Sequence, residues 1–266
     1  MHGKVLIIAG SDPGGGAGIQ ADLKTITALD GFAMTAITAL TVQNTLGVHN
    51  IHNIPASFVA EQIKAVLTDI GADCIKIGML SHPEIIDVVC NTLEQEAPDV
   101  PIVLDPVMVA KGGTSLLSDE AVEALKTSLV PRALILTPNI PEAETLVGFA
   151  APEIADAEAL AKALSNLGPQ GILLKGGHRE GEEIVDLLIE GDQIINIYKN
   201  PRIWTRHTHG TGCTLSAALA IGIAQGLSLR DSVERAREYV LEAIRSAPGY
   251  GGGHGPLNHA HTFGNP

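Results

Sequence analysis

Short apolar runs alternate with amphipathic segments along most of the chain. Strands are predicted where aliphatic and β-branched residues cluster, at residues 5–9, 33–40, 74–77, 102–104, 134–136 and 172–174. Helices are predicted where apolar residues recur at helical spacing, at residues 19–29, 56–70, 83–96, 119–130 and 155–167. This alternation predicts an α/β fold with a mostly parallel central sheet and helices on both faces.

The C-terminal third departs from this alternation. Residues 184–190 and 193–198 flank the turn residues Gly191 and Asp192, which predicts an antiparallel hairpin. Two helices are expected after it, the first containing the apolar run 215–223. A glycine-rich tail from about residue 247 is expected to be mobile or ordered by a ligand.

Composition bounds the size and the partners of the chain. With 266 residues and 45% hydrophobic content it can bury one sizeable core, so residues 1–266 are expected to form one domain. The formal net charge of −13 argues against nucleic acid or an anionic membrane as a partner. The chain has three cysteines, Cys74, Cys90 and Cys213, which cannot all pair with one another, so a reducing compartment is expected. No apolar segment reaches the length of a membrane span, and a cytoplasmic protein is therefore expected.

A glycine-rich segment from Gly10 to Gly18 follows the first predicted strand and opens the first helix. Glycine lets a backbone approach a ligand closely, although a tight turn without any ligand explains the segment about as well. The Gly-Lys-Ser/Thr ending of a Walker A loop is missing. Asp30 lies at a helix end and not after the second strand, which disfavours dinucleotide binding.

The segment 207–214, with the sequence HTHGTGCT, places glycine N–H groups and the thiol of Cys213 at a predicted helix N-terminus. Free N–H groups and the positive end of the helix dipole favour an anion such as a phosphate. The same position is expected to lower the pKa of the Cys213 thiol from its usual value of about 8.5. Thiolate would then be available as a base or a nucleophile.

Polar or flexible side chains follow other strands as well. Gln43 comes after the second predicted strand and Met79 after the third, and an amide near a thioether suits a flat polar heterocycle. Taken singly, Gln43 is typical of a loop and Met79 of a core. Lys175 follows the sixth strand and can bind a polyphosphate, although a solvated lysine is the commoner interpretation.

Asp105, Asn139 and Glu142 supply hard oxygen atoms after the fourth and fifth strands, as a Mg²⁺ site with substrate phosphates requires. Asn139 and Glu142 also have the spacing of a helix N-cap and its capping-box partner, and spacing alone favours capping. In the tail, His254, His259 and His261 match no well-defined metal-ligand spacing, so a polar tail is expected there.

Together these segments resemble the hydroxymethylpyrimidine/phosphomethylpyrimidine kinases of thiamine biosynthesis, within the ribokinase-like superfamily. The motifs are AGSDP (9–13), GGAGIQAD (15–22), KIGML (76–80), DPVM (105–108), TPN (137–139), KGGH (175–178) and HGTGCT (209–214). The resemblance extends from about residue 4 to residues 255–256.

The resemblance implies a three-layer α/β/α fold. It also implies phosphorylation of 4-amino-5-hydroxymethyl-2-methylpyrimidine, abbreviated HMP, and then of its monophosphate, with ATP and Mg²⁺. The resemblance also implies a role for each site residue. The pyrimidine would bind against Gln43, Gly10, Asp22, Met79 and Val107. The nucleotide would bind at Lys175, Asn139 and Thr208, and the metal at Glu142 and Asp105. The transferring phosphoryl group would bind at Gly210, Thr211 and Gly212, and Cys213 would be the base.

Cys213 stands where most sugar kinases of the superfamily have an aspartate base, which marks the pyrimidine or pyridoxine branch. The chain departs from the family pattern at Gly14, usually serine, and at His207, usually asparagine. A pyridoxal or pyridoxine kinase is the nearest alternative. A thiol hydrolase or acyltransferase using Cys213 with His209 or His207, and a non-catalytic nucleotide-binding regulator, are the others. By resemblance, the kinase is expected to be a homodimer.

Overall fold

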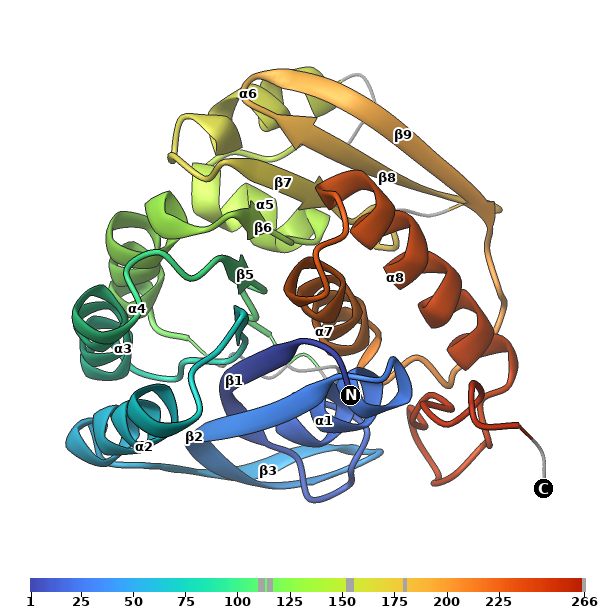
Figure 1. The fold of residues 1–266 in the computed structure, drawn as a ribbon. Coiled ribbons are helices and arrows are strands. Elements are labelled where there is room, and N and C mark those ends of the chain that lie inside the picture. Colours follow the sequence, from blue (N-terminus) through green and yellow to red (C-terminus); the bar gives the residue numbers. More distant parts are fainter. Residues whose placement is uncertain (110–112, 114–116, 152–155, 179–180, 265–266) are drawn as a thin grey trace.

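A central sheet organises the molecule (Figure 1). The computed structural model describes residues 1–109, 113, 117–151, 156–178 and 181–264. Within these residues the sheet has nine strands in the order β3-β2-β1-β4-β5-β6-β7-β8-β9. The strands from β2 to β7 in this order are parallel, whereas β3, β8 and β9 are antiparallel to their neighbours. The predicted mostly parallel sheet is confirmed.

The strands and helices follow the chain in regular order. The strands are β1 Lys4–Ser11, β2 Phe32–Asn44, β3 Gly47–Asn53, β4 Cys74–Ile77, β5 Ile102–Leu104, β6 Ile135–Leu136, β7 Gly171–Leu174, β8 Glu183–Glu190 and β9 Gln193–Pro201. The α-helices are α1 Gly18–Ala28, α2 Ala56–Asp69, α3 Pro83–Glu96, α4 Asp119–Ala124, α5 Ile140–Val147, α6 Ala157–Ser165, α7 Thr211–Ala224 and α8 Leu229–Arg245.

Two hydrophobic clusters cover the two faces of the sheet, because successive side chains of a strand point to opposite faces. In β1, Leu6 and Ile8 belong to the cluster formed with α2 to α6, while Val5 and Ile7 belong to the cluster formed with α1, α7 and α8. Figure 1 shows α7 and α8 on the opposite side of the sheet from α2, α3 and α4. The three-layer α/β/α arrangement is therefore confirmed.

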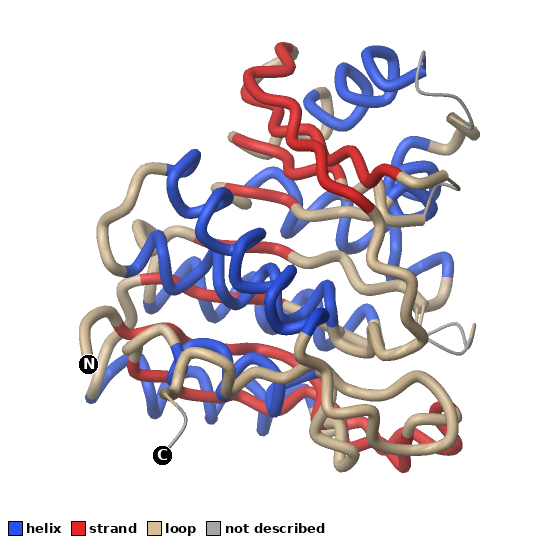
Figure 2. Tube along the Cα trace, turned by 90° about the vertical axis from the view of Figure 1, so that its right-hand side faces the viewer, coloured by secondary structure: helices blue, strands red, loops and turns tan. Residues whose placement is uncertain are grey.

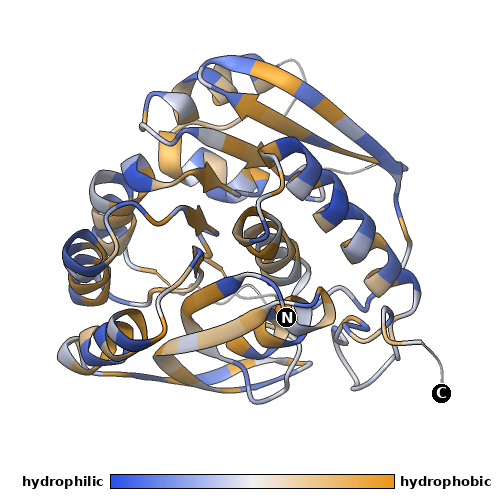
Figure 3. Ribbon diagram, in the orientation of Figure 1, coloured by the Kyte–Doolittle hydropathy of each residue, from blue (hydrophilic) through white to orange (hydrophobic). Residues whose placement is uncertain are grey.

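Helix α7 is unusual because most of its residues are buried. Figure 3 shows it in hydrophobic colours, whereas α8 outside it has a largely hydrophilic outer surface. A helix that is apolar all round must be enclosed by other elements. Here the sheet, α1 and α8 enclose α7, which fixes the position of its N-terminus at the carboxyl ends of the strands.

The largest difference from the sequence prediction lies in β2. We predicted a strand over residues 33–40 followed by a loop, but β2 continues to Asn44 and pairs with β3. Strand β3 is an edge strand with several exposed residues, so it lacks the apolar alternation that reveals a half-buried strand. Gln43 therefore lies in a hairpin and not in a loop.

Two predicted helices also differ in detail. The helix predicted over 119–130 is divided into α4, a π-helical turn at Leu125–Leu129 and a 3₁₀ turn at Val130–Arg132. Helix α6 begins at Ala157, and residue 155, where we predicted its start, lies outside the described residues. The predicted hairpin at Gly191 is confirmed, with Gly191 in the left-handed region at φ 59°.

The C-terminal tail packs against the body of the protein. Figure 2 shows it without regular helix or strand. The His254 N–H donates to the Thr45 carbonyl in the β2–β3 turn, and the Asn258 N–H donates to Ala243 O in α8. The described part of the tail is thus hydrogen-bonded to the β2–β3 turn and to α8. Whether a ligand orders the tail stays a prediction, and residues 265–266 lie outside the described part.

None of the helices in the described part of the chain is long and apolar enough to cross a bilayer.

Candidate active site

A pocket of about 730 Å³ opens at the carboxyl ends of the parallel strands. Ligands of open α/β sheets bind at this edge, beside the point where the strand order reverses. Here that point lies between β1 and β4. The lining includes every predicted site residue except Asp22 among those the structure describes.

One end of the pocket, which we call the recognition end, contains Asp12, Gln43 and His209. Asp12 is 2% exposed, and its carboxylate accepts N–H hydrogen bonds from Gly14, Gly16 and Ala17 at 2.8 to 3.0 Å. Burial opposes ionisation of Asp12, but its hydrogen bonds, the one with His209 first, outweigh burial and lower its pKa. The glycine-rich loop is therefore wrapped around an anionic side chain of its own.

His209 joins this carboxylate to Gln43. Its Nε2 atom lies 3.0 Å from Asp12 Oδ2 and 3.2 Å from the nearer end of the Gln43 side-chain amide. The ring is held tightly, since a Cβ atom added to Gly16 would lie only 2.5 Å from His209 Cδ2. Neither Asp12 nor the Asp12–His209 contact was predicted, because 197 residues separate the pair.

Gly10 and Met79 bring the ends of two neighbouring strands together beside Gln43. A Cβ atom on Gly10 would approach Met79 Cε to 2.5 Å, so the methyl end of Met79 would have to move away. Met79 is fixed through its backbone carbonyl, which accepts a hydrogen bond from Thr38 Oγ1 at 2.8 Å. Val107 lines the same pocket from the segment after β5. Met79 and Val107 thus add apolar side chains to the pocket lining.

The opposite end, which we call the charged end, contains Asp105, Glu142 and Lys175. Lys175 Nζ lies 2.9 Å from Asp105 Oδ1 and 4.0 Å from Glu142 Oε2. Asp105 also accepts hydrogen bonds from the hydroxyl groups of Thr137 and Ser216. Three different strand ends and α7 thus meet around one carboxylate.

The pKa values of the two carboxyl groups at the charged end are shifted in opposite directions. Burial opposes the ionisation of Asp105, but the nearby lysines, Lys175 first, lower its pKa. Burial raises the pKa of Glu142 to about 7, because Lys175 offsets only part of that penalty and Asp105 repels a second negative charge. Lys175 keeps its proton, since the two carboxyl groups raise its pKa against the effect of burial.

Asn139 and Glu142 form the predicted capping box of α5. The Glu142 N–H donates to Asn139 Oδ1 at 2.9 Å, and the Asn139 N–H donates to Glu142 Oε2 at 2.8 Å. Capping is therefore confirmed, and it holds the Glu142 carboxyl group against the pocket. No group of three or more His, Cys, Asp or Glu side chains that could hold a metal occurs in the described part of the chain, which includes the tail histidines His254, His259 and His261.

The start of α7 lies between the two ends. Gly210 precedes the helix in the left-handed conformation, at φ 82°, and Thr211 and Gly212 begin it. Gly210 packs directly on the Gly16 carbonyl, with no room for a side chain. Thr208 also lines the pocket, and its carbonyl accepts a hydrogen bond from Thr211 Oγ1 at 2.8 Å. The predicted glycine-rich helix start is thus exposed to the pocket.

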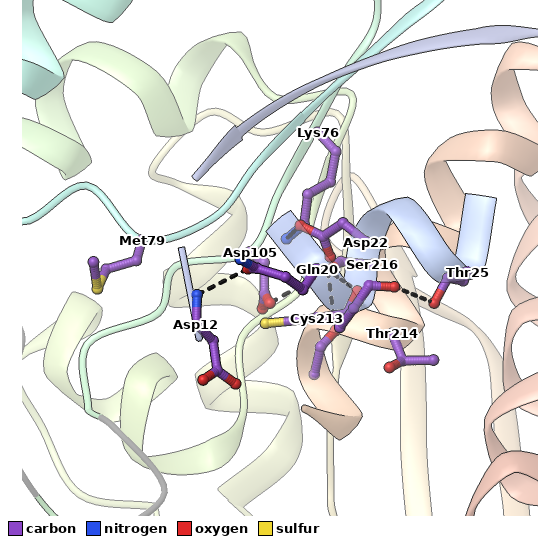
Figure 4. Close-up of polar contacts among 12 residues, drawn as sticks. Asp12, Gln20, Asp22, Thr25, Lys76, Met79, Asp105, Cys213, Thr214 and Ser216 are labelled. Atoms are coloured by element: carbon purple, nitrogen blue, oxygen red, sulfur yellow. Dashed lines mark hydrogen bonds and ion pairs between the residues drawn. The ribbon is translucent and has the colours of Figure 1, made fainter. Parts of the chain in front are cut away.

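Cys213 faces the same space as Asp12 and Asp105 (Figure 4). Its predicted low pKa is wrong: burial raises the pKa of the Cys213 thiol to about 11, and the carboxylates Asp22 and Asp105 add to the effect. Lys76 and a hydrogen bond from the Gly18 backbone act in the opposite direction but do not compensate. A helix N-terminus lowers a thiol pKa only where desolvation does not dominate.

A buried ion pair lies behind Cys213. Lys76 Nζ contacts Asp22 Oδ2 at 2.8 Å, and both side chains are 0% exposed (Figure 4). Lys76 lines the pocket, whereas Asp22 lies behind this wall and supports it through the lysine. The sequence signal for Lys76 is a charged residue inside the otherwise apolar β4, which we did not use.

The histidines near Cys213 do not form a catalytic pair with it. The Nε2 atom of His209 is directed at Asp12 and Gln43, and the Nδ1 atom of His207 has no hydrogen-bond partner in the described structure. A thiol hydrolase needs its base within hydrogen-bond reach of the sulfur. The arrangement thus disfavours that alternative.

Gly14, where the family pattern usually has serine, donates its N–H to Asp12 Oδ1. The glycine-rich loop therefore closes without a serine side chain at this position.

Known proteins resemble the chain over nearly its full length. The family model for phosphomethylpyrimidine kinase matches residues 12–258. The hydroxymethylpyrimidine/phosphomethylpyrimidine kinase of Bacillus subtilis is 48% identical over 257 residues, covering 96% of this chain and 94% of the relative. The Haemophilus influenzae protein of the same name is 46% identical and covers 96% of each chain.

Solved structures share the fold. The ADP complex of Bacillus subtilis pyridoxal kinase gives a TM-score of 0.89 at 33% identity and covers 98% of each chain. The phosphomethylpyrimidine kinase of Clostridium difficile gives 0.79 at 41% identity, covering 91% of this chain and 99% of that one. Structural similarity spans both kinase groups, whereas the family match and the sequence identity favour one. The resemblance of the motifs is confirmed, and the chain belongs to the hydroxymethylpyrimidine/phosphomethylpyrimidine kinase family of thiamine biosynthesis.

Proposed function

We propose that this chain transfers the γ-phosphoryl group of ATP to the hydroxymethyl group of HMP, and then a second one to the resulting monophosphate. The observation that carries this proposal is one pocket that joins the recognition end, the start of α7 and the charged end. Transfer between two bound molecules requires such a continuous space, because the acceptor and the donor must meet.

The recognition end suits the aminopyrimidine ring. Gln43 offers both a donor and an acceptor, which match a ring nitrogen and the neighbouring amino group. Met79, Val107 and the backbone of Gly10 form flat apolar walls on which an aromatic ring can lie. The hydroxymethyl group would then be directed toward Cys213.

The middle and the charged end suit a phosphoryl group. The N–H groups of Gly210, Thr211 and Gly212 lie at the start of a helix, where negative charge is stabilised. The Thr211 N–H also donates to the Thr208 carbonyl at 3.3 Å, so it would be shared with a phosphoryl group. The Lys175 ammonium group lies close to this position, since a Cβ atom on Gly212 would lie 3.4 Å from its Nζ. Backbone donors and a lysine together compensate the charge that spreads over the oxygens of a transferring phosphoryl group.

The charged end also fits Mg²⁺. This cation usually binds through one or two carboxylates together with substrate phosphates and water, and buried oxygens of Asp105 and Glu142 both reach the pocket. When bound, Mg²⁺ would neutralise phosphate charge. Asn139 would hold Glu142 in place through the capping box, and Thr208 would contribute to the nucleotide site.

The hydroxyl proton of HMP needs an acceptor, and Cys213 is our candidate. As the oxygen of the hydroxymethyl group bonds to phosphorus, the proton would pass to the Cys213 thiolate and ADP would leave. Because the thiol has a raised pKa, the thiolate is a minor species near neutral pH. The pH dependence of the rate therefore tests this role directly.

A time course of products tests the proposed function. Purified protein with HMP, ATP and Mg²⁺ should yield HMP monophosphate first and the diphosphate afterwards, with one ADP formed for each phosphoryl group transferred. Pyridoxal in place of HMP tests the pyridoxal kinase alternative, which the fold comparison keeps in view. Phosphorylation of pyridoxal alone would reject HMP as the substrate, and ATP binding without any product would favour the regulator.

Domain organisation, assembly and location follow as further proposals. We propose one cooperatively folding domain and a homodimer, supported by the exposed apolar residues Leu40, Val42 and Leu46 on the β2–β3 hairpin at the sheet edge. Calorimetry should show a single transition, and light scattering should give twice the chain mass. A cytoplasmic location stays a prediction from cysteine usage, which cell fractionation would test.

A further inference from the structure

We propose that His209 is a positioning residue that fixes the orientation of the Gln43 amide, and thereby makes the pocket select an aminopyrimidine over pyridoxal. The inference rests on the proposed function and concerns how the recognition end chooses its substrate. It follows from counting the hydrogens available to Asp12, His209 and Gln43.

The first step concerns Asp12. Its Oδ1 atom accepts the N–H of Gly14, and its Oδ2 atom accepts the N–H groups of Gly16 and Ala17. A carboxyl group with three backbone donors is an acceptor only, and Asp12 has no hydrogen to give. His209 Nε2, 3.0 Å from Oδ2, must therefore carry the hydrogen of that contact. This holds for both the neutral and the charged imidazole.

The second step concerns the Gln43 amide. The one hydrogen on His209 Nε2 points to Asp12, and a protonated Nε2 has no lone pair to accept an N–H of Gln43. Of the two ends of the amide, only the oxygen makes a favourable contact 3.2 Å from this nitrogen, because it can share that hydrogen. The two ends of an amide are distinguished by such partners. The geometry thus points to the amide with its oxygen toward His209 and its NH₂ group toward Thr41.

An independent contact requires the same orientation. Thr41 Oγ1 lies 2.9 Å from the Ser11 carbonyl and 3.2 Å from the side-chain amide of Gln43. A hydroxyl group has one hydrogen, and here the carbonyl, which can only accept, takes it. Thr41 can then only accept from Gln43, so an NH₂ group must face it. The contacts with His209 and with Thr41 therefore both favour the orientation in which the amide oxygen faces His209 and the NH₂ group faces Thr41.

The fixed amide presents an ordered pair of groups to the pocket. One lone pair of its oxygen and one hydrogen of its NH₂ group remain, and they match the amino group and the adjacent ring nitrogen of an aminopyrimidine. Pyridoxal has an aldehyde oxygen in place of that amino group. An amide that could turn would offer its N–H to the aldehyde, whereas the fixed one offers oxygen against oxygen. Holding the amide in place therefore favours an aminopyrimidine over pyridoxal.

The surroundings keep His209 in position. The backbone N–H of His209 donates to the Gly255 carbonyl of the tail at 3.1 Å, and the Gly16 backbone packs against the imidazole ring. His209 is 8% exposed, so little room remains for another rotamer. The tail and the glycine-rich loop thus hold the residue that orients Gln43.

Two substitutions test this role. His209→Phe keeps a ring but removes the N–H, whereas His209→Gln keeps a donor near the position of Nε2. For His209→Phe we expect the ratio of kcat/KM for HMP to kcat/KM for pyridoxal to fall roughly tenfold, mostly through KM for HMP, as the loss of one directed hydrogen bond implies. His209→Gln should restore the ratio to within about threefold of the parent.

The outcomes separate this inference from the proposed function. Parental protein that does not phosphorylate HMP would reject the proposed function itself. An active parent whose substrate ratio is unchanged in His209→Phe, or changes equally in both variants, would overturn the positioning role. If His209→Phe does not fold, Thr41→Val decides, since it removes the other partner of the amide: a fall of the ratio by severalfold supports the inference, and an unchanged ratio overturns it.

Discussion

The recognition end and the charged end of the pocket are organised by different forces. Around Gln43, each contact depends on which atom carries a hydrogen, and Asp12 receives its donors from the backbone of one loop. Around Lys175, two carboxyl groups share one ammonium group, and the charges determine the protonation states. Directed hydrogen bonds discriminate between similar molecules, whereas clustered charge stabilises a highly charged transition state. Substitutions at the recognition end should therefore change substrate selectivity, and substitutions at the charged end should change turnover.

Cys213→Ala should have the largest effect, because the site between the two ends would lose its proton acceptor. We expect kcat to fall about 10²- to 10⁴-fold with substrate and nucleotide binding retained. In the parent, kcat/KM for HMP should rise with pH above neutrality, by up to about tenfold per unit, because the thiolate fraction grows toward the thiol pKa of about 11.

Steady-state kinetics between pH 6.5 and 9.5 measures both effects, and Cys90→Ala is the matched control because its thiol does not line the pocket. An alanine variant that turns over within about threefold of the parent would remove Cys213 as the base, since general-base loss costs far more. Cys213 would then be a packing residue of α7.

Gln43→Leu tests the recognition end at its centre. The substitution keeps the approximate size and removes both directed contacts, so KM for HMP should rise roughly 5- to 150-fold while KM for ATP changes little. Isothermal titration with HMP and with a nucleotide analogue separates the two effects. Equal KM values for HMP in variant and parent would show that the pyrimidine binds elsewhere.

Glu142→Gln tests the charged end and divides its two roles. Glutamine still caps α5, so the melting temperature should stay close to that of the parent, whereas loss of the carboxylate should raise KM for Mg-ATP about tenfold. A Mg²⁺ titration of the rate, combined with a thermal melt, measures both. Parental turnover at every Mg²⁺ concentration would reduce Glu142 to a helix cap.

The same contrast explains how much of the molecule could be predicted. The strands at residues 74–77 and 102–104 and the helix at 83–96 have the predicted bounds, because buried apolar runs and a Pro-containing helix start are local signals. Edge strand β3 was missed because neither of its faces is consistently buried. Local patterns report burial, and they fail where a strand has little of it.

Site chemistry was predictable where a motif is contiguous and not where distant residues meet. The glycines before Cys213 indicated a helix start, but the raised thiol pKa depends on its burial and on Asp22, Lys76 and Asp105, which come from other elements. The pairing of Asp12 with His209 likewise appears only in three dimensions. Sequence reasoning therefore located the pocket and missed part of its electrostatics.

The smallest expected effect concerns the tail, which contacts the recognition end and the start of α7. The Gly255 carbonyl accepts a hydrogen bond from the backbone N–H of His209 at the recognition end. His259 Nε2 lies 3.0 Å from the Oγ1 atom of Thr214, the residue after Cys213 in α7. Burial, with the nearby charges of Lys24 and His261, lowers the pKa of His259 from 6.5 to about 4. Between these values the unfolded chain binds the proton that the folded chain does not, so stability falls as the pH decreases.

Between pH 7.5 and 5.5, the free energy of unfolding should therefore decrease by about 1 kcal/mol because of His259. His259→Gln cannot titrate, so this part of the pH dependence should be absent from the variant. Urea unfolding at the two pH values measures it, with the exposed His2→Gln as the control that should keep the parental pH dependence. An equal loss in the parent and in His259→Gln would mean that the tail stays docked when His259 is charged. The tail would then not link the pH of the solution to the pocket.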